Sequence, residues 1–211
     1  MRIIKLLFFF ISAIAFSQQA PTPTPLSDSE TIQFKENVAK RSDGLKSLSS
    51  DFMQSKYIQL MQGVAISKGR LFYKAPNILK WEYSTPYDYQ ILFKDNQLFI
   101  NDDGDKSVSN LKSNKLFEKL VNLISGSING GLLADSHNYN VAYFITGNYI
   151  TALIVPKDPA IRQMFREIIL VFNKEYMVIS VKLMEDSGDF TEIFFKNIRI
   201  NQNLQDSIFE N

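Results

Sequence analysis

Side chains that carry out most enzyme chemistry are scarce in this chain. The sequence has no cysteine and a single histidine, His137, which excludes disulfides, thiolate metal sites and any site built from a pair of histidines. No Gly-x-Ser-x-Gly nucleophile motif is present. His137 itself lies in a polar connection, where a surface imidazole is a better interpretation than a general base. We therefore expect no catalytic residue, no metal site and no cofactor.

Two overlapping runs of polar residues could hold a phosphate or a calcium ion. The run Gly104-Asp105-Lys106-Ser107 faintly resembles a phosphate loop, but it lacks the earlier glycine and falls in a hairpin rather than between a strand and a helix. The acids of residues 102–105 could suggest calcium, yet no glutamate follows at the twelfth position of such a loop. Solvated turn acids are the better interpretation, so a binding protein is favoured over an enzyme.

The first residues have the layout of a secretory signal peptide. Arg2 and Lys5 form a basic region, and Leu6 to Phe16 form an apolar run that is short for a membrane span. We expect cleavage after Ser17, the alternative being an uncleaved N-terminal anchor. Because the chain has no cysteine, it is not itself a lipidated lipoprotein. The mature protein is expected to be exported.

Charge and length limit the possible partners and the number of domains. Removing residues 1–17 leaves 21 basic and 22 acidic residues, a net charge of −1. This balance gives no electrostatic reason to expect binding of nucleic acid or of anionic membranes. Residues 18–27 form a Pro/Thr-rich spacer that we expect to stay extended, outside any helix or ladder. Residues 28–211 are long enough for one domain with a sizeable core.

The period of the apolar residues changes from helical to strand-like along the chain. Ser27 or Asp28 is expected to cap a helix that runs to about Leu48, and a second helix is expected from Lys115 to Ser125. The expected strands cover residues 50–60, 63–73, 78–84, 88–94, 97–101, 106–110, 138–146, 149–156, 166–173, 177–185 and 189–196. Since no βαβ alternation appears, the sequence predicts the α+β class, with a single large antiparallel sheet and helices packed on one side.

The expected sheet has more apolar surface than two modest helices can easily cover. Leu79, Trp81 and Tyr83 share one face of their strand, and residues 166–172 are apolar on both faces. A sheet of this kind either curls toward a barrel or keeps an apolar cavity. We expect a cavity.

The densest motif of the chain is Gly69-x-Leu71-x-Tyr73-x-x-Pro76-Asn77-x-Leu79-x-Trp81-x-Tyr83-x-x-Pro86. It resembles the signature of the LolA family, the periplasmic carriers of outer-membrane lipoproteins. The hairpin of Tyr89–Ile100, the helix before Phe52-x-Gln54, and Ile198–Phe209 as a final strand and tail also match that family. The resemblance covers nearly all of the expected mature chain.

The resemblance implies a large curved antiparallel sheet, an incomplete, half-closed β-barrel, with helices covering its concave face. It also implies an apolar cavity for acyl chains. Leu79 and Trp81 match motif positions that line this cavity, and the strand alternation adds Leu71, Tyr73 and Tyr83. The lid helix would carry Leu116, Phe117, Leu120 and Ile124. For each of these residues, ordinary core packing is the alternative.

One position departs from the family pattern. Members of the family carry an arginine before the first proline of the motif, where it ties the lid shut, and this chain has Ala75. A latch built on Lys74 or Lys80 is the alternative that the neighbouring residues offer.

The resemblance also implies partners and a compartment. These are acylated lipoproteins as cargo, an inner-membrane lipoprotein-release complex, an outer-membrane acceptor, and the periplasm of a Gram-negative bacterium. The carrier is expected to be a monomer and to bind no nucleic acid. Two alternatives stay open: the same fold carrying another amphiphile, such as a glycolipid, fatty acid or pigment precursor, or a non-catalytic periplasmic sensor or interaction domain.

Overall fold

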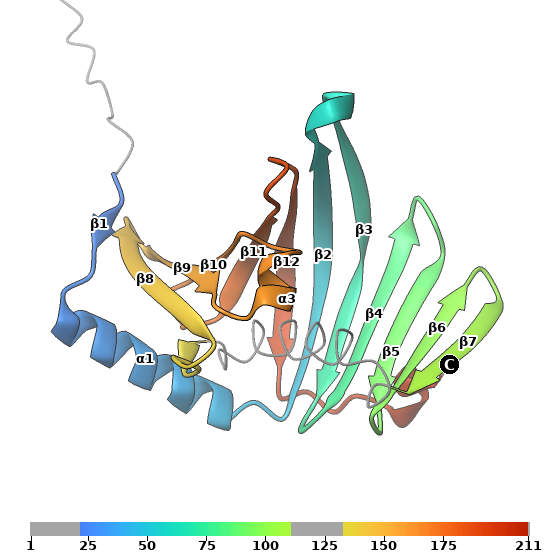
Figure 1. The fold of residues 1–211 in the computed structure, drawn as a ribbon. Coiled ribbons are helices and arrows are strands. Elements are labelled where there is room, and N and C mark those ends of the chain that lie inside the picture. Colours follow the sequence, from blue (N-terminus) through green and yellow to red (C-terminus); the bar gives the residue numbers. More distant parts are fainter. Residues whose placement is uncertain (1–21, 111–132, 211) are drawn as a thin grey trace, which may run out of the picture.

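One large curved antiparallel sheet dominates the computed structural model, which describes residues 22–110 and 133–210 (Figure 1). The strands are β1 (Thr24–Pro25), β2 (Ser47–Ile58), β3 (Gly63–Lys74), β4 (Ile78–Thr85), β5 (Tyr89–Lys94), β6 (Gln97–Asp102), β7 (Asp105–Asn110), β8 (Tyr139–Thr146), β9 (Tyr149–Pro156), β10 (Glu167–Phe172), β11 (Val178–Met184) and β12 (Phe190–Ile200). The helical elements are α1 (Asp28–Asp43), α3 (Pro159–Arg162) and the 3₁₀ turns η1 (Gln59–Met61) and η4 (Asp206–Phe209).

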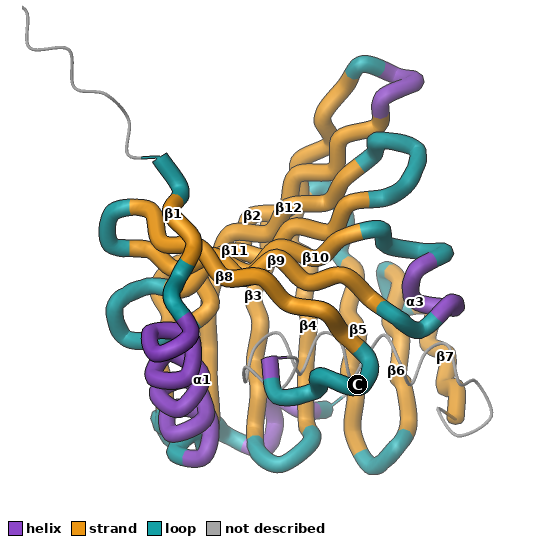
Figure 2. Tube along the Cα trace, turned by 60° about the vertical axis from the view of Figure 1, so that its left-hand side comes forward, coloured by secondary structure: helices purple, strands orange, loops and turns teal. Residues whose placement is uncertain are grey.

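The strand order shows how two separate meanders join into this sheet. The order is β1-β8-β9-β10-β11-β12-β2-β3-β4-β5-β6-β7, so β12 pairs with β2 across most of the chain length. Strands β1 and β7 stand at opposite ends, and the sheet does not close into a barrel. It is strongly curved, because β8 to β10 run nearly across the direction of β3 to β6 (Figure 2).

The large antiparallel sheet predicted from the alternation of residues is confirmed, and most strands begin and end within three residues of the expected bounds. The first helix is shorter than expected: α1 ends at Asp43 with Gly44 as its C-cap, and Leu48 belongs to β2. The spacer prediction was wrong for Thr24 and Pro25, which pair with β8. The backbone N–H of Leu26 extends this contact by donating to the carbonyl of Tyr143 at 3.0 Å.

Two predicted segments lie outside the described residues. These are the signal peptide of residues 1–17 and the lid helix with Leu116, Phe117, Leu120 and Ile124. The expectation that helices cover the concave face therefore remains a prediction for that part of the sheet. None of the helices in the described part of the chain has the length and hydropathy that a membrane span requires.

Helix α1 begins at a complete capping box. The side-chain oxygen of Ser27 accepts from the Glu30 N–H at 3.4 Å, and a Glu30 carboxylate oxygen accepts from the Ser27 N–H at 2.8 Å. Phe34 and Val38 lie one helical turn apart and are buried against strands β8 to β11. The ring of Phe34 meets Phe172 edge-on, with 5.1 Å between centroids. This helix therefore packs on the β8–β11 half of the sheet.

The face that α1 packs against is called here the inner face. Val181 in the cluster beneath α1 is the cross-strand partner of Ile193, which belongs to the next cluster. The pairing of β12 with β2, of β2 with β3 and of β3 with β4 places Phe52, Leu71 and Trp81 on this same face. The apolar core thus runs without interruption along the inner face from β8 to β5.

The C-terminal segment packs on the opposite, outer face. After β12 the chain crosses to η4, where Phe209 is 2% exposed and lies in a cluster with Phe72 and Leu92. Residues 198–209 were expected to form a final strand and tail. The strand is the end of β12, and the tail contains a 3₁₀ turn of which Phe209 is buried.

The first prediction concerns Tyr143, whose buried phenol has its pKa raised to about 12. The pKa of this phenol is about 10 in the unfolded chain, so between about pH 10 and about pH 12 the folded state holds its proton more tightly than the unfolded state does. The stability of the fold is therefore unaffected by this group below about pH 10 and falls as the pH rises toward about 12. In the Tyr143→Phe variant the ring keeps its place beside Phe34 but no longer titrates. The free energy of unfolding, measured by urea denaturation, should therefore fall less between about pH 9 and about pH 11 in the variant. Equal falls in both proteins would contradict this.

Candidate functional site

The five predicted cavity residues come together on the inner face. Leu71 pairs with Trp81, and Tyr73 pairs with Leu79, across β3 and β4. Tyr83 lies opposite Gly69, one step further along the same face. All are buried except Tyr83, which is half-buried. The alternation in the sequence predicted their common orientation correctly.

Trp81 is the centre of an aromatic group on this face. Its ring centroid lies 4.6 Å from that of Phe52 and 6.2 Å from that of Phe195. Phe52 also meets Tyr83 edge-on at 5.2 Å. These contacts offer broad apolar ring faces, the kind of surface that binds a hydrocarbon chain through area rather than through directed bonds.

Two tyrosine hydroxyls here are satisfied within the sheet, while the indole N–H of Trp81 is buried without a hydrogen-bond partner in the part of the chain that the structure describes. The Tyr83 hydroxyl donates to Oε1 of Gln54 at 3.0 Å, and the Tyr73 hydroxyl donates to the carbonyl of Pro76 at 3.1 Å. Burial raises the pKa of the Tyr83 phenol above its ordinary value, which keeps the hydroxyl neutral. The site therefore presents little polarity to a ligand at the inner face.

Sequence reasoning missed the part of this group that other strands supply. The missed residues, which lie on β2, on β12 or in connections, are Leu45, Leu48, Phe52, Met177, Ile193, Phe195, Ile198 and Ile200. The β2 residues could have been found from their alternation, since Leu48, Ser50 and Phe52 share a face. The β12 residues could not, because their position depends on the pairing of β12 with β2.

A small pocket lies within this cluster among the described residues. Its volume is about 20 Å³, and its lining residues are Leu48, Ser50, Leu71, Met177, Val178, Phe195 and Ile198. A cavity of this size has room for about one water molecule, so this pocket is too small for an acyl chain. Any hydrocarbon ligand at this place must displace packed side chains.

Arg41 marks the edge of the cluster at the end of α1. Its Nη2 lies 3.2 Å from the sulfur of Met177, which lines the small pocket. Its Nε is buried without a hydrogen-bond partner among the described residues. A thioether is a weak acceptor, so this contact holds the end of α1 only weakly.

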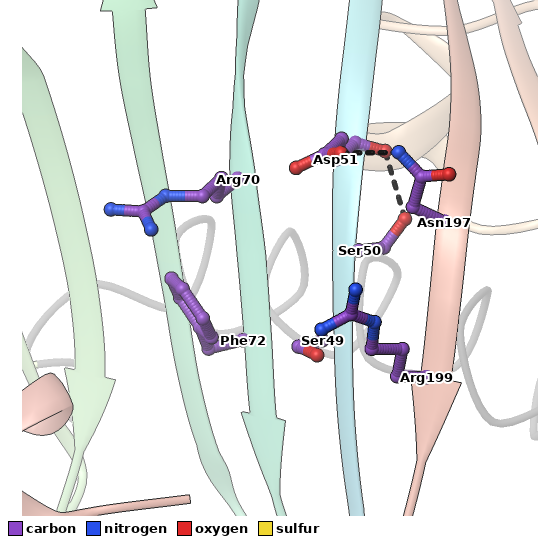
Figure 3. Close-up of a pocket in the computed structure, with 7 residues that line it drawn as sticks. All are labelled: Ser49, Ser50, Asp51, Arg70, Phe72, Asn197 and Arg199. Atoms are coloured by element: carbon purple, nitrogen blue, oxygen red, sulfur yellow. Dashed lines mark hydrogen bonds between the residues drawn. The ribbon is translucent and has the colours of Figure 1, made fainter.

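A larger pocket of about 230 Å³ lies on the outer face (Figure 3). Its lining residues are Ser49, Ser50, Asp51, Arg70, Phe72, Asn197 and Arg199. The Asn197 amide donates to Oδ2 of Asp51 at 2.7 Å, and Arg70 pairs with Glu82 at 3.2 Å. This polar, charged hollow does not fit the chemistry of acyl chains.

The lysines considered for a lid latch serve another purpose. Lys74 and Lys80 both point to the outer face, where they bind the C-terminal segment. Nζ of Lys74 lies 2.6 Å from Oδ1 of Asp206, and this hydrogen bond lowers the pKa of the Asp206 carboxyl. Nζ of buried Lys80 donates to the Glu210 carbonyl at 3.2 Å and pairs with Glu82 at 3.0 Å. A latch on the inner face from either lysine is therefore wrong for the described structure.

An open antiparallel sheet with an apolar, aromatic inner face defines a fold of the lipid-binding carrier class. The family model described as outer membrane lipoprotein carrier protein LolA matches residues 43–211, about four-fifths of the chain. The chain therefore belongs to the LolA family. None of the curated proteins matches its sequence.

Solved structures similar to this chain share its fold at low sequence identity. The match to a chain in the MucA/MucB complex of Pseudomonas aeruginosa has a TM-score of 0.51 and 9% identity, and it covers 86% of this chain and 61% of that one. A LolA superfamily protein from Nitrosomonas europaea matches at 10% identity and a TM-score of 0.45, with 86% and 97% covered. The lipoprotein LppX of Mycobacterium tuberculosis matches at 10% identity and a TM-score of 0.49, with 85% and 100% covered. The first of these supports the shared fold.

Proposed function

We propose that this protein is a periplasmic carrier that binds the acyl chains of lipoproteins against the inner face of its sheet, around Trp81, and takes them from the inner to the outer membrane. The observation that carries the proposal is the continuous aromatic face of β2, β3, β4 and β12 in a chain of the LolA family. The cargo partners are an inner-membrane release complex and an outer-membrane acceptor. Catalysis plays no part in the proposal.

At the small pocket among the described residues, the energetics of such a carrier would depend on exchange of contacts. Each buried methylene is worth about 0.8 kcal/mol, so acyl chains together carry a large cost in water. The inner cluster is packed around a pocket of only about 20 Å³ in the described state. Binding therefore replaces contacts among the protein's own apolar side chains by contacts with the ligand. An exchange of similar contacts is reversible, so the carrier can release its cargo without hydrolysing a nucleotide.

The end of α1 is the place where this exchange would begin. Leu45, which follows the helix, packs against the inner cluster, and Arg41 touches only the thioether of Met177 with its Nη2. Movement of this end would expose Leu71 and Phe195 from the small pocket. The weakness of the Arg41 contact lowers the cost of such an opening.

A fluorescence experiment tests the site directly, because Trp81 is the only tryptophan of the chain. The protein is mixed with a synthetic triacylated lipopeptide whose acyl chains carry bromine, a quencher that acts at contact distance. We expect strong quenching of Trp81 emission, and no quenching by the same lipopeptide without bromine. Binding without quenching would show that the acyl chains bind at a site away from Trp81. Absence of binding would contradict the carrier proposal. A brominated free fatty acid, tested in parallel, distinguishes the other-amphiphile alternative.

A matched pair of leucine variants separates binding from folding, and this is our second prediction. Leu79 on β4 and Leu92 on β5 are 6% and 3% exposed, and they lie on the inner and outer face respectively. Both Leu79→Glu and Leu92→Glu bury a carboxylate and should lose similar stability. In the folded fraction of the Leu79→Glu variant, lipopeptide uptake should fall by at least about tenfold relative to wild type, whereas the folded fraction of Leu92→Glu should keep its uptake. Equal uptake by the two variants, measured after isolating the folded fraction, would overturn the assignment of the inner face.

A further inference from the structure

The hairpin of β2 and β3 projects well beyond the rest of the sheet (Figures 1 and 2). Strand β3 pairs with β4 only from Lys68 onward, so residues 63–67 have β2 as their one partner among the described strands. On the other side, β12 supports β2 as far as Tyr57. The turn η1 and the first residues of β3 therefore form a narrow tip that stands clear of the core.

This tip is apolar and almost fully exposed. Leu60 is 94% exposed and Met61 is 73% exposed, while Val64 and Ile66 remain 56% and 53% exposed. Every residue from 57 to 67 is uncharged. Four large apolar side chains gathered at one protruding point cost free energy in water and contribute nothing to the core, which is typical of a surface that becomes covered in use.

Charged groups lie beside the first residues of β3 as well as below them, because Lys56 pairs with Ala65. Lys56 and Lys68 bracket the uncharged run, and Nζ of Lys182 lies 3.9 Å above the ring of Phe190, beside Tyr57. Acidic groups occur in the neighbouring turn between β11 and β12, where Oδ1 of Asp189 accepts from the Gln59 N–H at 2.9 Å. The turn itself has no charged side chain, while Lys56 lies beside residues 64–66 and Oδ1 of Asp189 binds the first residue of η1.

We propose that this tip is a membrane-binding site, inserting Leu60, Met61, Val64 and Ile66 into the surface of a lipid bilayer. With a rise of about 3.4 Å per residue, Lys68 lies about 17 Å from Gly63 along the strand. Apolar segments of interfacial proteins enter a bilayer by about 5–10 Å. The tip would therefore reach the acyl boundary while Lys68 lies at the level of the lipid phosphates, to which its charge is complementary. Lys56, opposite Ala65, would lie deeper, and its flexible stem would carry the ammonium group outward to the same level.

The shape of the tip favours a bilayer over a folded protein as the partner. A protein would have to offer a groove that encloses a projection exposed on all sides, whereas a bilayer surrounds an inserted side chain wherever it enters. The balanced charge of the chain is compatible with this, because insertion of apolar side chains does not require electrostatic attraction. The site goes beyond the binding of cargo and gives the carrier its own contact with the membrane.

Vesicle binding by matched variants tests the proposal. Purified protein is sedimented with large unilamellar vesicles of phosphatidylethanolamine and phosphatidylglycerol. Wild type should cosediment, and Leu60→Glu should weaken the partition at least about tenfold, since a charge at the tip would enter the bilayer. Val64 on the tip and Val108 on β7 are 56% and 58% exposed. Val64→Glu should weaken binding as well, and Val108→Glu should leave it unchanged. Absence of wild-type binding, or equal binding by Val64→Glu and Val108→Glu, would overturn the proposal.

The absence of cysteine allows a second measurement at chosen positions. Leu60→Cys and Val108→Cys are each labelled with an environment-sensitive fluorophore and mixed with the same vesicles. Emission should rise and shift to the blue for the label at position 60 only. Because Leu60→Glu leaves the inner face untouched, it should keep the Trp81 quenching by brominated lipopeptide. Failure of membrane binding and failure of cargo binding are therefore distinguishable.

Discussion

Replacing Gly69 by alanine is expected to lower the free energy of unfolding by more than about 3 kcal/mol. A Cβ at this position would collide with the carbonyl oxygen of Glu82 on the paired strand β4, and it would lie 2.7 Å from Cζ of Phe52. The carbonyl belongs to the ladder between β3 and β4, so it cannot move away without breaking strand pairing. The clash therefore affects the two strands that carry Trp81 and Leu71.

Gly44→Ala is the matched control for this prediction. Gly44 follows α1 with an ordinary helical conformation, and an added Cβ would have its nearest contact at 3.7 Å. Alanine there should be neutral or stabilise the protein by about 0.4–1 kcal/mol through the unfolded state. Thermal unfolding measures both, with about 2–4 °C of midpoint shift per kcal/mol for a chain of this size. A Gly69→Ala midpoint equal to that of Gly44→Ala would contradict the close approach of the two strands.

Phe52→Ala is expected to cost about 3–5 kcal/mol of unfolding free energy. Phe52 is 3% exposed and lies between Trp81 and Tyr83, with ring centroids 4.6 Å and 5.2 Å away. Its removal leaves a cavity beside Trp81, so the emission of Trp81 should also change. The same cavity would add room next to the small pocket, and a bound acyl chain should recover part of the lost stability.

Phe194→Ala provides the comparison for the Phe52→Ala prediction. Phe194 is 38% exposed and lies on the outer face of β12, directly before Phe195 of the inner cluster. Its loss should cost less than about 1 kcal/mol and leave Trp81 emission unchanged. Urea denaturation with and without a triacylated lipopeptide measures all of these quantities. If the two variants were equally stable, Phe52 would not be part of a packed inner core.

Local patterns in the sequence predicted much of this structure. Alternation along 79–83 and 69–73 gave the strands and their common face correctly, because side-chain direction in a strand depends only on local geometry. The start of the first helix at Ser27 or Asp28 was also predicted correctly, because the capping residues are local to it. The family motif also falls on neighbouring strands, so its residues meet without any long-range pairing.

Features that depend on contacts between distant segments could not be predicted. The pairing of β12 with β2 brings Phe195 to Trp81, yet nothing local to either strand specifies that partner. Pro25 lacks strand propensity, and Thr24 lies between two prolines, so pairing with β8 is what orders these two residues. The size of the inner pocket depends on how side chains from four strands interlock, which composition does not determine. The lysines beside Ala75 bind the tail because Phe209 is buried on the outer face.

The way the sheet ends at β1 has a consequence for self-association at high concentration. An unpaired strand edge offers N–H and carbonyl groups to another copy and can nucleate fibres. Strand β1 has only two residues, and its second, Pro25, has no N–H to donate. Another chain approaching there would find too short a ladder to extend. The part of this edge that β1 covers, beside Phe144 and Ile145, should therefore resist polymerisation.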